Sequence, residues 1–408
     1  MAAELSKGKS PFYPGQPVPV ELFVGRSAQI DHIMTRGVGQ VAAGKPVAVF
    51  IQGEYGIGKS SIASFVQYAA EMKHELHAIY APLGGAKTLT DLSEAVMLAT
   101  VNSGAFNPRI SERIRNWLAK YVGKQELWGG FTANVDALRK DAPALSSAFG
   151  MLDFLRQVPA RLKEEGVKGV FLVLDEINGI AGNPDFAHFI KGLVDQNALS
   201  PAPVPLLLML CGVEERRWEM IRNHQPIDRI FDVIEIEAMN SDEMEEFFTR
   251  AFDSVGMKVE KGAMEVLTHY AAGFPKIVHL VGDAAFWRDQ DGIIDTADAL
   301  DALFLAADEV GKKYMDQQVY NALRSEDYRS ILRKIAKTAP DDMSFLKSSV
   351  EKELSDPEKK KFNNFLQRMK RLKVLKSGDV AGQYVFTMRM VRLYLWLETS
   401  RDKEHSKA

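Results

Sequence analysis

Three glycines, a lysine and a serine occur at a spacing that can bind a chain of phosphates. The stretch GEYGIGKSS, residues 53–61, fits the pattern G-x-x-x-x-G-K-[ST]. Glycine lets backbone N–H groups approach an anion closely and accepts positive φ angles. In such a loop the lysine reaches the β- and γ-phosphates and the hydroxyl that follows it binds Mg²⁺. The predicted nucleotide-binding residues are Gly53, Gly56, Ile57, Gly58, Lys59, Ser60 and Ser61.

An acidic pair forms the second chemical group. The stretch GVFLVLDEINGI contains an apolar run, residues 170–174, followed by Asp175 and Glu176. Carboxylates at the carboxyl end of a buried parallel strand point into the crevice where α/β proteins bind ligands. We predict that Asp175 holds Mg²⁺ together with Ser60, and that Glu176 orients and polarises the attacking water. With Lys59 on the phosphates, this pair favours nucleotide hydrolysis over nucleotide binding alone.

Strands and a helix must position these side chains. The run VAVFIQ, residues 47–52, is typical of a buried parallel strand. After the glycines, SSIASFVQYAAEM places apolar residues at helical spacing. The acidic pair ends a second buried run, and residues 204–212 form a third. The sequence therefore predicts an α/β fold with a parallel sheet around the phosphate loop.

The composition is that of a globular protein. The chain has 408 residues, of which 46% are hydrophobic and 26% charged, so it can bury a large core in two or three domains. No apolar run reaches the length of about 18 residues that a membrane span needs, and residues 1–19 lack the apolar region of a secretory signal. A single cysteine, Cys211, excludes an intrachain disulfide. We expect a cytoplasmic protein without membrane contact.

Charge is distributed unevenly along the chain. Residues 321–408 carry 20 Lys and Arg against 12 Asp and Glu, a surplus of +8. Residues 1–320 carry 31 against 42, or −11. A basic end on an acidic body indicates that one module meets a polyanion, although a merely solvated basic face gives the same composition.

Together these motifs resemble the AAA+ ATPases, in the branch that contains the origin-recognition ATPases and the related STAND-type switch ATPases. The resemblance covers most of residues 20–400. The stretch FVGRSAQIDHI, residues 23–33, is similar to the family segment F-x-G-R-x-x-E-I, which packs beside the adenine ring. The resemblance implies that Phe23, Val24 and Arg26 lie near the base. A turn before a helix is the alternative interpretation of this segment.

The family's first sensor falls on unusual residues. The stretch VPLLLMLCGVEE, residues 204–215, resembles the strand that carries this sensor, which is usually Asn, Ser or Thr. Here the position falls on Cys211 or Gly212. Because cysteine is a weak hydrogen-bond donor, we expect slow turnover.

Residues 223–248 resemble the family segment that contains the arginine finger and leads into the fifth strand of the sheet. The resemblance therefore implies an arginine finger in this segment. Arg229 is the leading candidate for a finger that enters the site of a neighbouring subunit. Its rivals are Arg216, Arg217 and Arg222. An ordinary surface arginine is the alternative.

A helical lid is implied by the stretch AAGFPKIVHLVGDAAFW, residues 271–287, which resembles the family's second sensor, G-x-P-R. Pro275 suits the first turn of a helix, and Lys276 occupies the arginine position. Lysine meets phosphate as a point charge without the fork of arginine, so the implied role is a γ-phosphate contact, with a solvated lysine as the alternative. Upstream, Asn240 and Glu243 have the spacing of a capping box.

The basic end is predicted to form three helices and then two strands. The helices are DYRSILRKIAK, MSFLKSSVEKEL and DPEKKKFNNFLQRMKRLKVL, the third with Asp356 as its N-cap and Pro357 in its first turn. The stretch VLKSGDVAGQYVFTMR gives strand, glycine turn and strand. This order resembles a winged helix-turn-helix, the C-terminal module of origin-recognition ATPases.

One face of the third predicted helix suits double-stranded DNA. It combines amides, which can read base edges, with lysines and arginine, which can bind phosphates. The predicted DNA-binding residues are Lys359, Lys360, Asn363, Asn364, Gln367, Lys370 and Arg371, with Lys376 in the wing. Winged helices also bind proteins, so a protein partner is the alternative.

The sequence thus predicts a P-loop core of the AAA+ type, a helical lid and a C-terminal winged helix. The predicted boundaries are an N-terminal extension at 1–20, the core at 21–239, the lid at 240–316, the winged helix at 317–400 and a tail at 401–408. Residues 104–150 fit no core element and are left open between a helical insertion and a partner surface.

The leading hypothesis is an ATP- and Mg²⁺-dependent switch that controls assembly and DNA binding in replication, transposition or genome defence. It would act as a homo-oligomer or with partner ATPase subunits. One alternative is a STAND-like signalling or scaffold ATPase whose winged helix binds protein. Another is an assembly protein that binds nucleotide without hydrolysing it.

Overall fold

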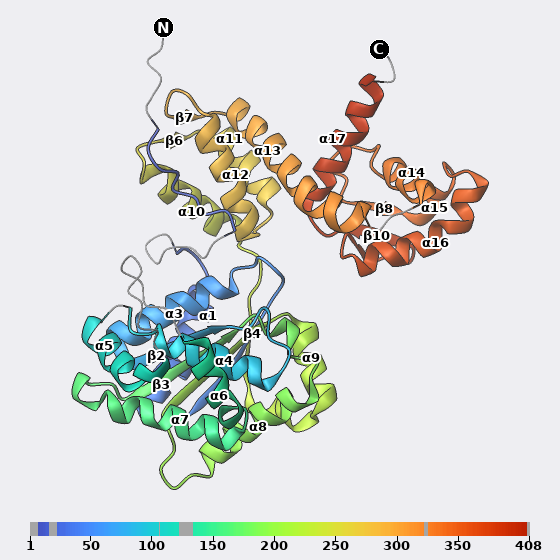
Figure 1. The fold of residues 1–408 in the computed structure, drawn as a ribbon. Helices are drawn as coiled ribbons and strands as arrows, with labels where there is room; N and C mark the ends of the chain where they lie inside the picture. Colours follow the sequence, from blue (N-terminus) through green and yellow to red (C-terminus); the bar gives the residue numbers. More distant parts are fainter. Residues whose placement is uncertain (1–6, 16–22, 106, 122–133, 322–324, 406–408) are drawn as a thin grey trace. The chain divides into compact units, whose positions relative to one another are not determined.

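The computed structural model describes residues 7–15, 23–105, 107–121, 134–321 and 325–405 (Figure 1). The chain divides into two compact units. One is Pro17–Glu237, and the other combines Met1–Gln16 with Ala238–Ala408. The described residues 7–15 are therefore grouped with the C-terminal half of the chain. Among the helices of the described ranges, none is long and apolar enough to span a bilayer.

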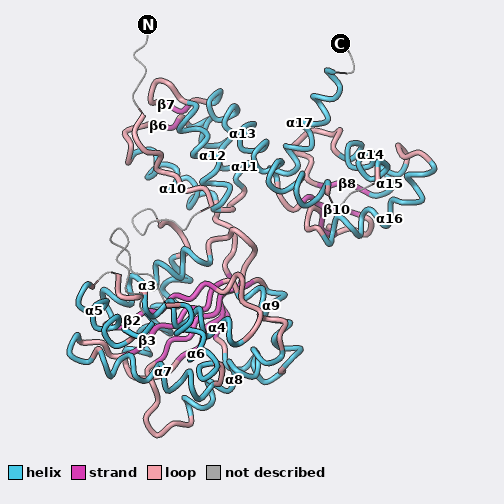
Figure 2. The backbone as a smooth tube through the Cα atoms, viewed as in Figure 1, coloured by secondary structure: helices cyan, strands magenta, loops and turns pink. Residues whose placement is uncertain are grey.

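A five-stranded parallel sheet forms the centre of the Pro17–Glu237 unit (Figure 2). Its strand order is β2-β3-β4-β1-β5. Its strands are β1 Val47–Gln52, β2 Leu76–Pro82, β3 Gly169–Asp175, β4 Leu206–Gly212 and β5 Asp232–Glu235. Every residue of β3 and β4 is buried. The continuous apolar runs predicted such strands, because a parallel strand covered on both faces needs no polar side.

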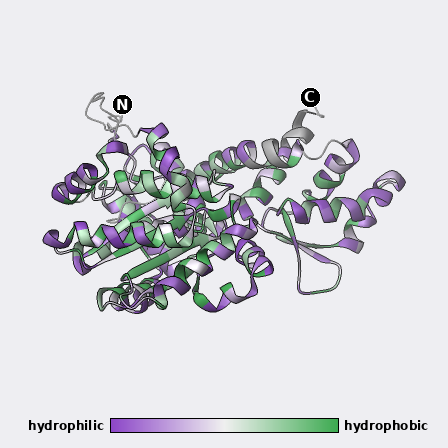
Figure 3. Ribbon diagram, turned by 60° about the horizontal axis from the view of Figure 1, so that its bottom comes forward, coloured by the Kyte–Doolittle hydropathy of each residue, from purple (hydrophilic) through white to green (hydrophobic). Residues whose placement is uncertain are grey.

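Helices cover both faces of this sheet. They are α1 Ser27–His32, η2 Ile33–Val38, α2 Gly39–Ala42, α3 Lys59–His74, α4 Leu89–Val101, α5 Pro108–Trp117, η3 Ala119–Tyr121, α6 Val135–Leu145, α7 Ala148–Arg161, η4 Lys163–Glu165, η5 Ile177–Gly179, α8 Pro184–Ala198, α9 Glu214–Asn223 and η6 Gln225–Ile230. Phe50, Leu172 and Leu208 pack in one buried cluster with side chains of α4 to α8. Because side chains alternate along a strand, the residues between them face the other layer, where α3 packs. In Figure 3 the strands of the sheet are coloured mainly as hydrophobic.

The described part of residues 104–150 is helical and packs into this core. Ile114 of α5, Tyr121 of η3 and Leu138 of α6 belong to the same buried cluster as the sheet. The segment 122–133, which includes Trp128 and Phe131, lies outside the described residues.

The residues predicted to form the lid belong to the other unit. Their elements are α10 Ser241–Asp253, β6 Lys258–Val259, α11 Lys261–Ala271, α12 Pro275–Arg288, β7 Ile293–Ile294, α13 Thr296–Val310 and η7 Gly311–Tyr320. The expected capping box is confirmed, since Asn240 and Glu243 exchange hydrogen bonds of 2.9 Å at the start of α10. Pro275 opens α12 as expected.

A segment near the N-terminus packs against these lid helices. The ring of Phe12 is 4% exposed and makes an edge contact with Phe252 at 4.9 Å between centroids. A β-carbon at Gly282 would lie 2.3 Å from the Phe12 ring, so only glycine leaves room for it. The Tyr13 N–H donates to Nδ1 of His279 at 3.1 Å. Burial lowers the pKa of His279 to about 4, which keeps this acceptor neutral at physiological pH.

The C-terminal part alternates helices with a small antiparallel sheet of order β8-β10-β9. Its elements are α14 Glu326–Ile335, β8 Ser344–Leu346, α15 Lys347–Glu351, α16 Asp356–Arg371, β9 Leu375–Ser377, β10 Gln383–Phe386 and α17 Arg389–His405. The helix expected over 343–354 is wrong at its start, because residues 344–346 pair with β10 instead. The N-cap of α16 is Ser355, which forms a capping box with Glu358, and not Asp356.

A fully buried arginine ties the end of α14 to α17. The guanidinium of Arg392 lies 5.4 Å from the centroid of the Phe386 ring. Its N–H groups donate to the carbonyls of Ala336, Thr338, Ala339 and Asp342 and to the Thr338 hydroxyl, at 2.7–3.2 Å. One side chain thus satisfies the carbonyls that follow the last turn of α14.

We expect Arg392→Met to destabilise this unit by about 3–5 kcal/mol, because it fills similar space but leaves several buried carbonyls without donors. Thermal or denaturant unfolding of the full chain measures the loss. Arg389→Met, on the same helix but only half-buried, is the matched control and should cost less than about 1 kcal/mol. Equal losses in the two variants would contradict the role given to the Arg392 hydrogen bonds.

Candidate functional site

The phosphate loop connects β1 to α3, as the sequence predicted. The backbone of Gly53 packs closely against the backbone of Ile236, since a β-carbon at Gly53 would be 2.8 Å from the carbonyl oxygen of Ile236. Gly58 has a φ of 100° and is the residue before the first turn of α3. That conformation favours glycine and turns the chain so that the helix N-terminus follows the loop. The loop therefore presents backbone N–H groups and a helix dipole, which together favour an anion.

Lys59 lies over this loop. Its Nζ donates to the carbonyl oxygens of Gly53 and Glu54, each at 2.9 Å. Burial lowers the pKa of Lys59, and the negative charge of Asp175 opposes that shift. The ammonium is therefore held at the loop by two neutral carbonyl acceptors.

Ser60 and Asp175 meet although 115 positions separate them in the chain. The Ser60 hydroxyl donates to Oδ2 of Asp175 at 2.6 Å. The Asp175 residue is 4% exposed. Its Oδ1 accepts the N–H of Glu176 at 2.8 Å. These two oxygen-bearing side chains are the kind that Mg²⁺ prefers. In the part of the chain that the structure describes, no cluster of three or more His, Cys, Asp or Glu side chains could hold a metal.

Tyr80 was missed by sequence reasoning. Its hydroxyl also donates to Oδ2 of Asp175, from the neighbouring strand β2. Burial raises the pKa of the Tyr80 hydroxyl above its ordinary value, and the negative charge of Asp175 raises it too. A signal existed in the alternation of the run LHAIYAP, because Ile79 and Ala81 face the α4–α8 core and leave Tyr80 on the α3 side. The alternation alone could not predict that Tyr80 contacts Asp175, because that contact depends on the register of β2 against β3.

Glu176 leaves the strand in a left-handed conformation, with φ 56° and ψ 48°. Its side chain is exposed, and its carboxylate lies against the loop after β2. A β-carbon at Gly84 would be 2.4 Å from Oε2 of Glu176, so this glycine makes room for the acid. The structure thus separates the pair: Asp175 is buried beside Ser60, and Glu176 reaches solvent.

The two residues at the predicted first-sensor position, Cys211 and Gly212, lie on opposite faces of β4. A β-carbon at Gly212 would meet Ile177 at 3.1 Å and Phe50 at 3.4 Å, on the α4–α8 side. Cys211 therefore faces the α3 side, where Lys59 and Asp175 lie. Burial, and then the charge of Asp175, raise the pKa of the Cys211 thiol well above its ordinary value, so it stays neutral.

Solved structures share this arrangement of sheet and helices. The Walker-type ATPase of Pyrococcus abyssi has a TM-score of 0.55 and 18% identity, over 92% of this chain and 96% of its own. The ORC2 protein of Aeropyrum pernix, in its ADPNP–ADP complexes, has a TM-score of 0.55 and 12% identity, over 93% of both chains. The fold is that of a P-loop ATPase of the AAA+ type. Neither a protein-family model nor a curated protein matches the sequence.

The residues predicted beside the base lie next to the phosphate loop of this AAA+ fold. Arg26 is buried and donates from Nη2 to the carbonyl oxygen of Ile57 at 2.7 Å. The rings of Phe23 and Phe65 of α3 lie 5.0 Å apart, and Val24 is buried. The structure thus brings Arg26 to the loop and Phe23 to α3, and the contact of all three residues with a base stays a prediction.

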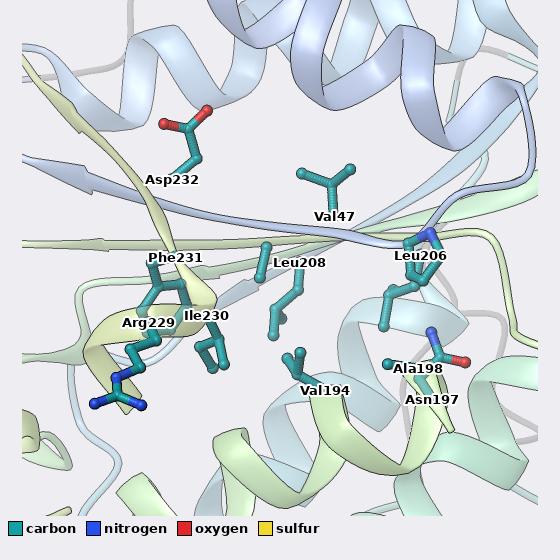
Figure 4. A pocket seen from close by; sticks show the side chains of 12 residues that line it. Val47, Val194, Asn197, Ala198, Leu206, Leu208, Arg229, Ile230, Phe231 and Asp232 are labelled. Carbon is teal, nitrogen blue, oxygen red and sulfur yellow. The ribbon is translucent and has the colours of Figure 1, made fainter. Parts of the chain in front are cut away.

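Arg229 lies at the other edge of the sheet. It lines a pocket of about 390 Å³ at the amino ends of β1, β4 and β5, with Val47, Leu206 and Phe231 (Figure 4). The phosphate loop follows the carboxyl end of β1, so Arg229 does not meet Lys59 of its own chain. A finger acts on a neighbouring chain, and its assignment therefore stays a prediction.

The rival arginines lie along α9. Arg216 forms an ion pair with Glu219, and Arg217 pairs with Asp228 and donates to Oε1 of Gln52 at 3.1 Å. Arg222 is exposed. Lys276, the second residue of α12, is exposed on the lid, and its phosphate contact also stays a prediction.

The face of α16 predicted to bind DNA is exposed. Phe362, Phe365 and Met369 are buried, as the periodicity predicted. Seven of the predicted contacts are exposed: Lys359, Lys360, Asn363, Asn364, Gln367, Arg371 and Lys376. Lys370 is half-buried and donates to the Ser377 hydroxyl at 2.9 Å, which joins α16 to β9.

The buried acid of α16, Glu358, does not neutralise this face. Glu358 is buried and accepts from Lys334 at 2.6 Å. Burial alone would raise its pKa, but hydrogen bonds from Lys334, Ser330 and Ser355 together lower it to about 2. Its charge is therefore compensated inside the unit, and the lysines of the outward face keep their net positive charge.

Proposed function

We propose that this protein binds and hydrolyses ATP with Mg²⁺ and uses its nucleotide state to control assembly and DNA binding. The observation that carries the proposal is the 2.6 Å hydrogen bond between Ser60 and Asp175. It joins the end of the phosphate loop to the acidic end of β3, which is the juxtaposition that a nucleotide-bound metal requires. The AAA+ fold and the nucleotide complexes of the ORC2 relative support the same function.

Each side chain has a defined task in this proposal. The loop amides and Lys59 bind the phosphates, and the ammonium exchanges its carbonyl acceptors for phosphate oxygens. Ser60 and Asp175 would hold Mg²⁺, which supplies positive charge to the phosphate oxygens when it is bound. Glu176, exposed beside Gly84, orients and polarises the attacking water. Cys211 is only a weak donor toward this site, so turnover is expected to be slow.

The C-terminal part supports DNA binding. The order α14, β8, α15, α16, β9, β10 and the antiparallel pairing of its strands fit a winged helix-turn-helix. In such a module α16 is the element that would enter the major groove, with Lys376 beside a backbone phosphate. We further propose that Arg229 of one chain and Lys276 of the lid respond to the γ-phosphate and couple it to assembly.

A protein-binding role for the same module is the second candidate. Val380, at the turn between β9 and β10, is 62% exposed, and Leu346 of β8 is 45% exposed. Exposed apolar side chains of this size suit a protein partner better than a phosphate backbone. This candidate corresponds to the STAND-like signalling ATPase.

The decisive experiment is nucleotide binding by the wild type and by Lys59→Ala. We expect Lys59→Ala to bind a fluorescent ATP analogue about tenfold to hundredfold more weakly, since a hydrogen bond to a charged group contributes about 1.5–3 kcal/mol. Fluorescence titration measures both dissociation constants. Lys45→Ala, an exposed lysine before β1, is the control and should bind like the wild type. The proposal would be contradicted by a wild type without affinity for ATP, or by a Lys59→Ala variant whose affinity equals that of the wild type.

A further inference from the structure

Asp175 is held by three donors, and only two of them belong to the predicted site. Its Oδ1 accepts the backbone N–H of Glu176, and its Oδ2 accepts the hydroxyls of both Ser60 and Tyr80. Backbone and side chain thus fix both oxygens of one carboxylate. Ser60 is itself a proposed metal ligand, whereas Tyr80 has no task in nucleotide binding.

The geometry points to Tyr80 as a positioning residue for the metal site: its hydroxyl fixes the orientation in which Asp175 holds Mg²⁺. This inference rests on the proposed nucleotide site and names a residue that acts through Asp175, without contact to ATP. The residues come from neighbouring strands, since the Tyr80 Cα pairs with Val173 of β3 and Asp175 follows two positions later on the same face.

A fixed carboxylate matters for this particular metal. Mg²⁺ demands near-ideal octahedral geometry, so a ligand that rotates by a small angle binds it poorly. Asp175 is almost completely buried, and water cannot replace a lost donor there without a cavity to hold it.

Tyr80→Phe removes the hydroxyl and keeps the ring. We expect the Mg²⁺ concentration for half-maximal binding of a fluorescent ATP analogue to rise about tenfold to hundredfold, which is the usual effect of losing the partner of a metal ligand. Affinity for the same analogue in EDTA should stay at the wild-type value, because the loop amides and Lys59 do not depend on Tyr80. Tyr121→Phe, which alters a buried tyrosine of the same unit outside the site, is the matched control and should leave both quantities unchanged.

Coupling to Asp175 is tested by a double-mutant cycle. Tyr80→Phe added to Asp175→Asn should have no further effect on the Mg²⁺ dependence, because the group that Tyr80 orients has already been changed. An unchanged Mg²⁺ dependence in Tyr80→Phe overturns the inference. So does an equal loss of affinity in EDTA, since the hydroxyl would then support the fold and not the metal site. If the wild type shows no ATP binding at all, the proposed function has failed first.

Discussion

Replacing Glu176 with glutamine is expected to lower the rate of ATP hydrolysis by about 10²–10⁴-fold, while ATP still binds. The expected loss is the contribution of one positioned acid–base group, equivalent to about 3–5 kcal/mol in the activation barrier. Glutamine has nearly the same shape as glutamate, so it should fit beside Gly84 and keep the left-handed backbone of residue 176. Only the negative charge that polarises the water is lost.

The structure predicts that binding survives because Glu176 is separated from the phosphate loop contacts. Its carboxylate lies at Gly84, whereas Lys59 and Ser60, the proposed nucleotide contacts, belong to α3. Single-turnover hydrolysis and equilibrium binding of ATP, measured on the same preparations, separate the two effects. Glu164→Gln, an exposed acid paired with Arg113, is the control and should leave both unchanged.

Two results would count against this assignment. Undiminished turnover in Glu176→Gln would show that another group activates the water. A wild type that binds ATP but never hydrolyses it would favour the non-hydrolysing assembly protein.

A trapped ATP state in Glu176→Gln also provides the material in which assembly and DNA retention can be measured together.

Alanine at Lys359, Lys360, Lys370 and Arg371 is expected to weaken duplex DNA binding by about 10²–10⁴-fold at low salt. Each lost phosphate contact should also flatten the plot of log K against log salt by about 0.9, so the slope should change by about 3–4. The cause is counterion release, which scales with the number of phosphates that the protein neutralises. Anisotropy titrations of a labelled duplex at several salt concentrations measure both quantities.

The matched control removes equal charge from another part of the same unit. It carries alanine at four exposed lysines of the lid elements: Lys258, Lys261, Lys312 and Lys313. Net charge then changes equally in both variants, and only the face of α16 distinguishes them. Equal losses of duplex affinity in the two variants would show that DNA binding depends on net charge and not on the face of α16. A wild type without affinity for duplex DNA would favour the protein-binding module.

The features that the sequence determined by itself are each formed by a short stretch of chain. The phosphate loop, the strand before it, the helix after it and the acidic end of β3 follow from glycine spacing and apolar runs. The capping box at Asn240 and the exposed face of α16 follow in the same way. Each depends on residues within one or two turns or one strand, where backbone geometry relates spacing directly to position.

The tertiary structure decided the contacts between distant segments. The register of β2 against β3 brings Tyr80 to Asp175, across 95 positions of sequence. Strand β8 replaces the start of a predicted helix because β10 offers hydrogen bonds that local propensity does not include. The faces of β4 place Cys211, and not Gly212, beside Lys59. Periodicity tells which side chains share a face, but only the packed sheet determines which strand lies next to which, and that order sets the partners of the chemical groups.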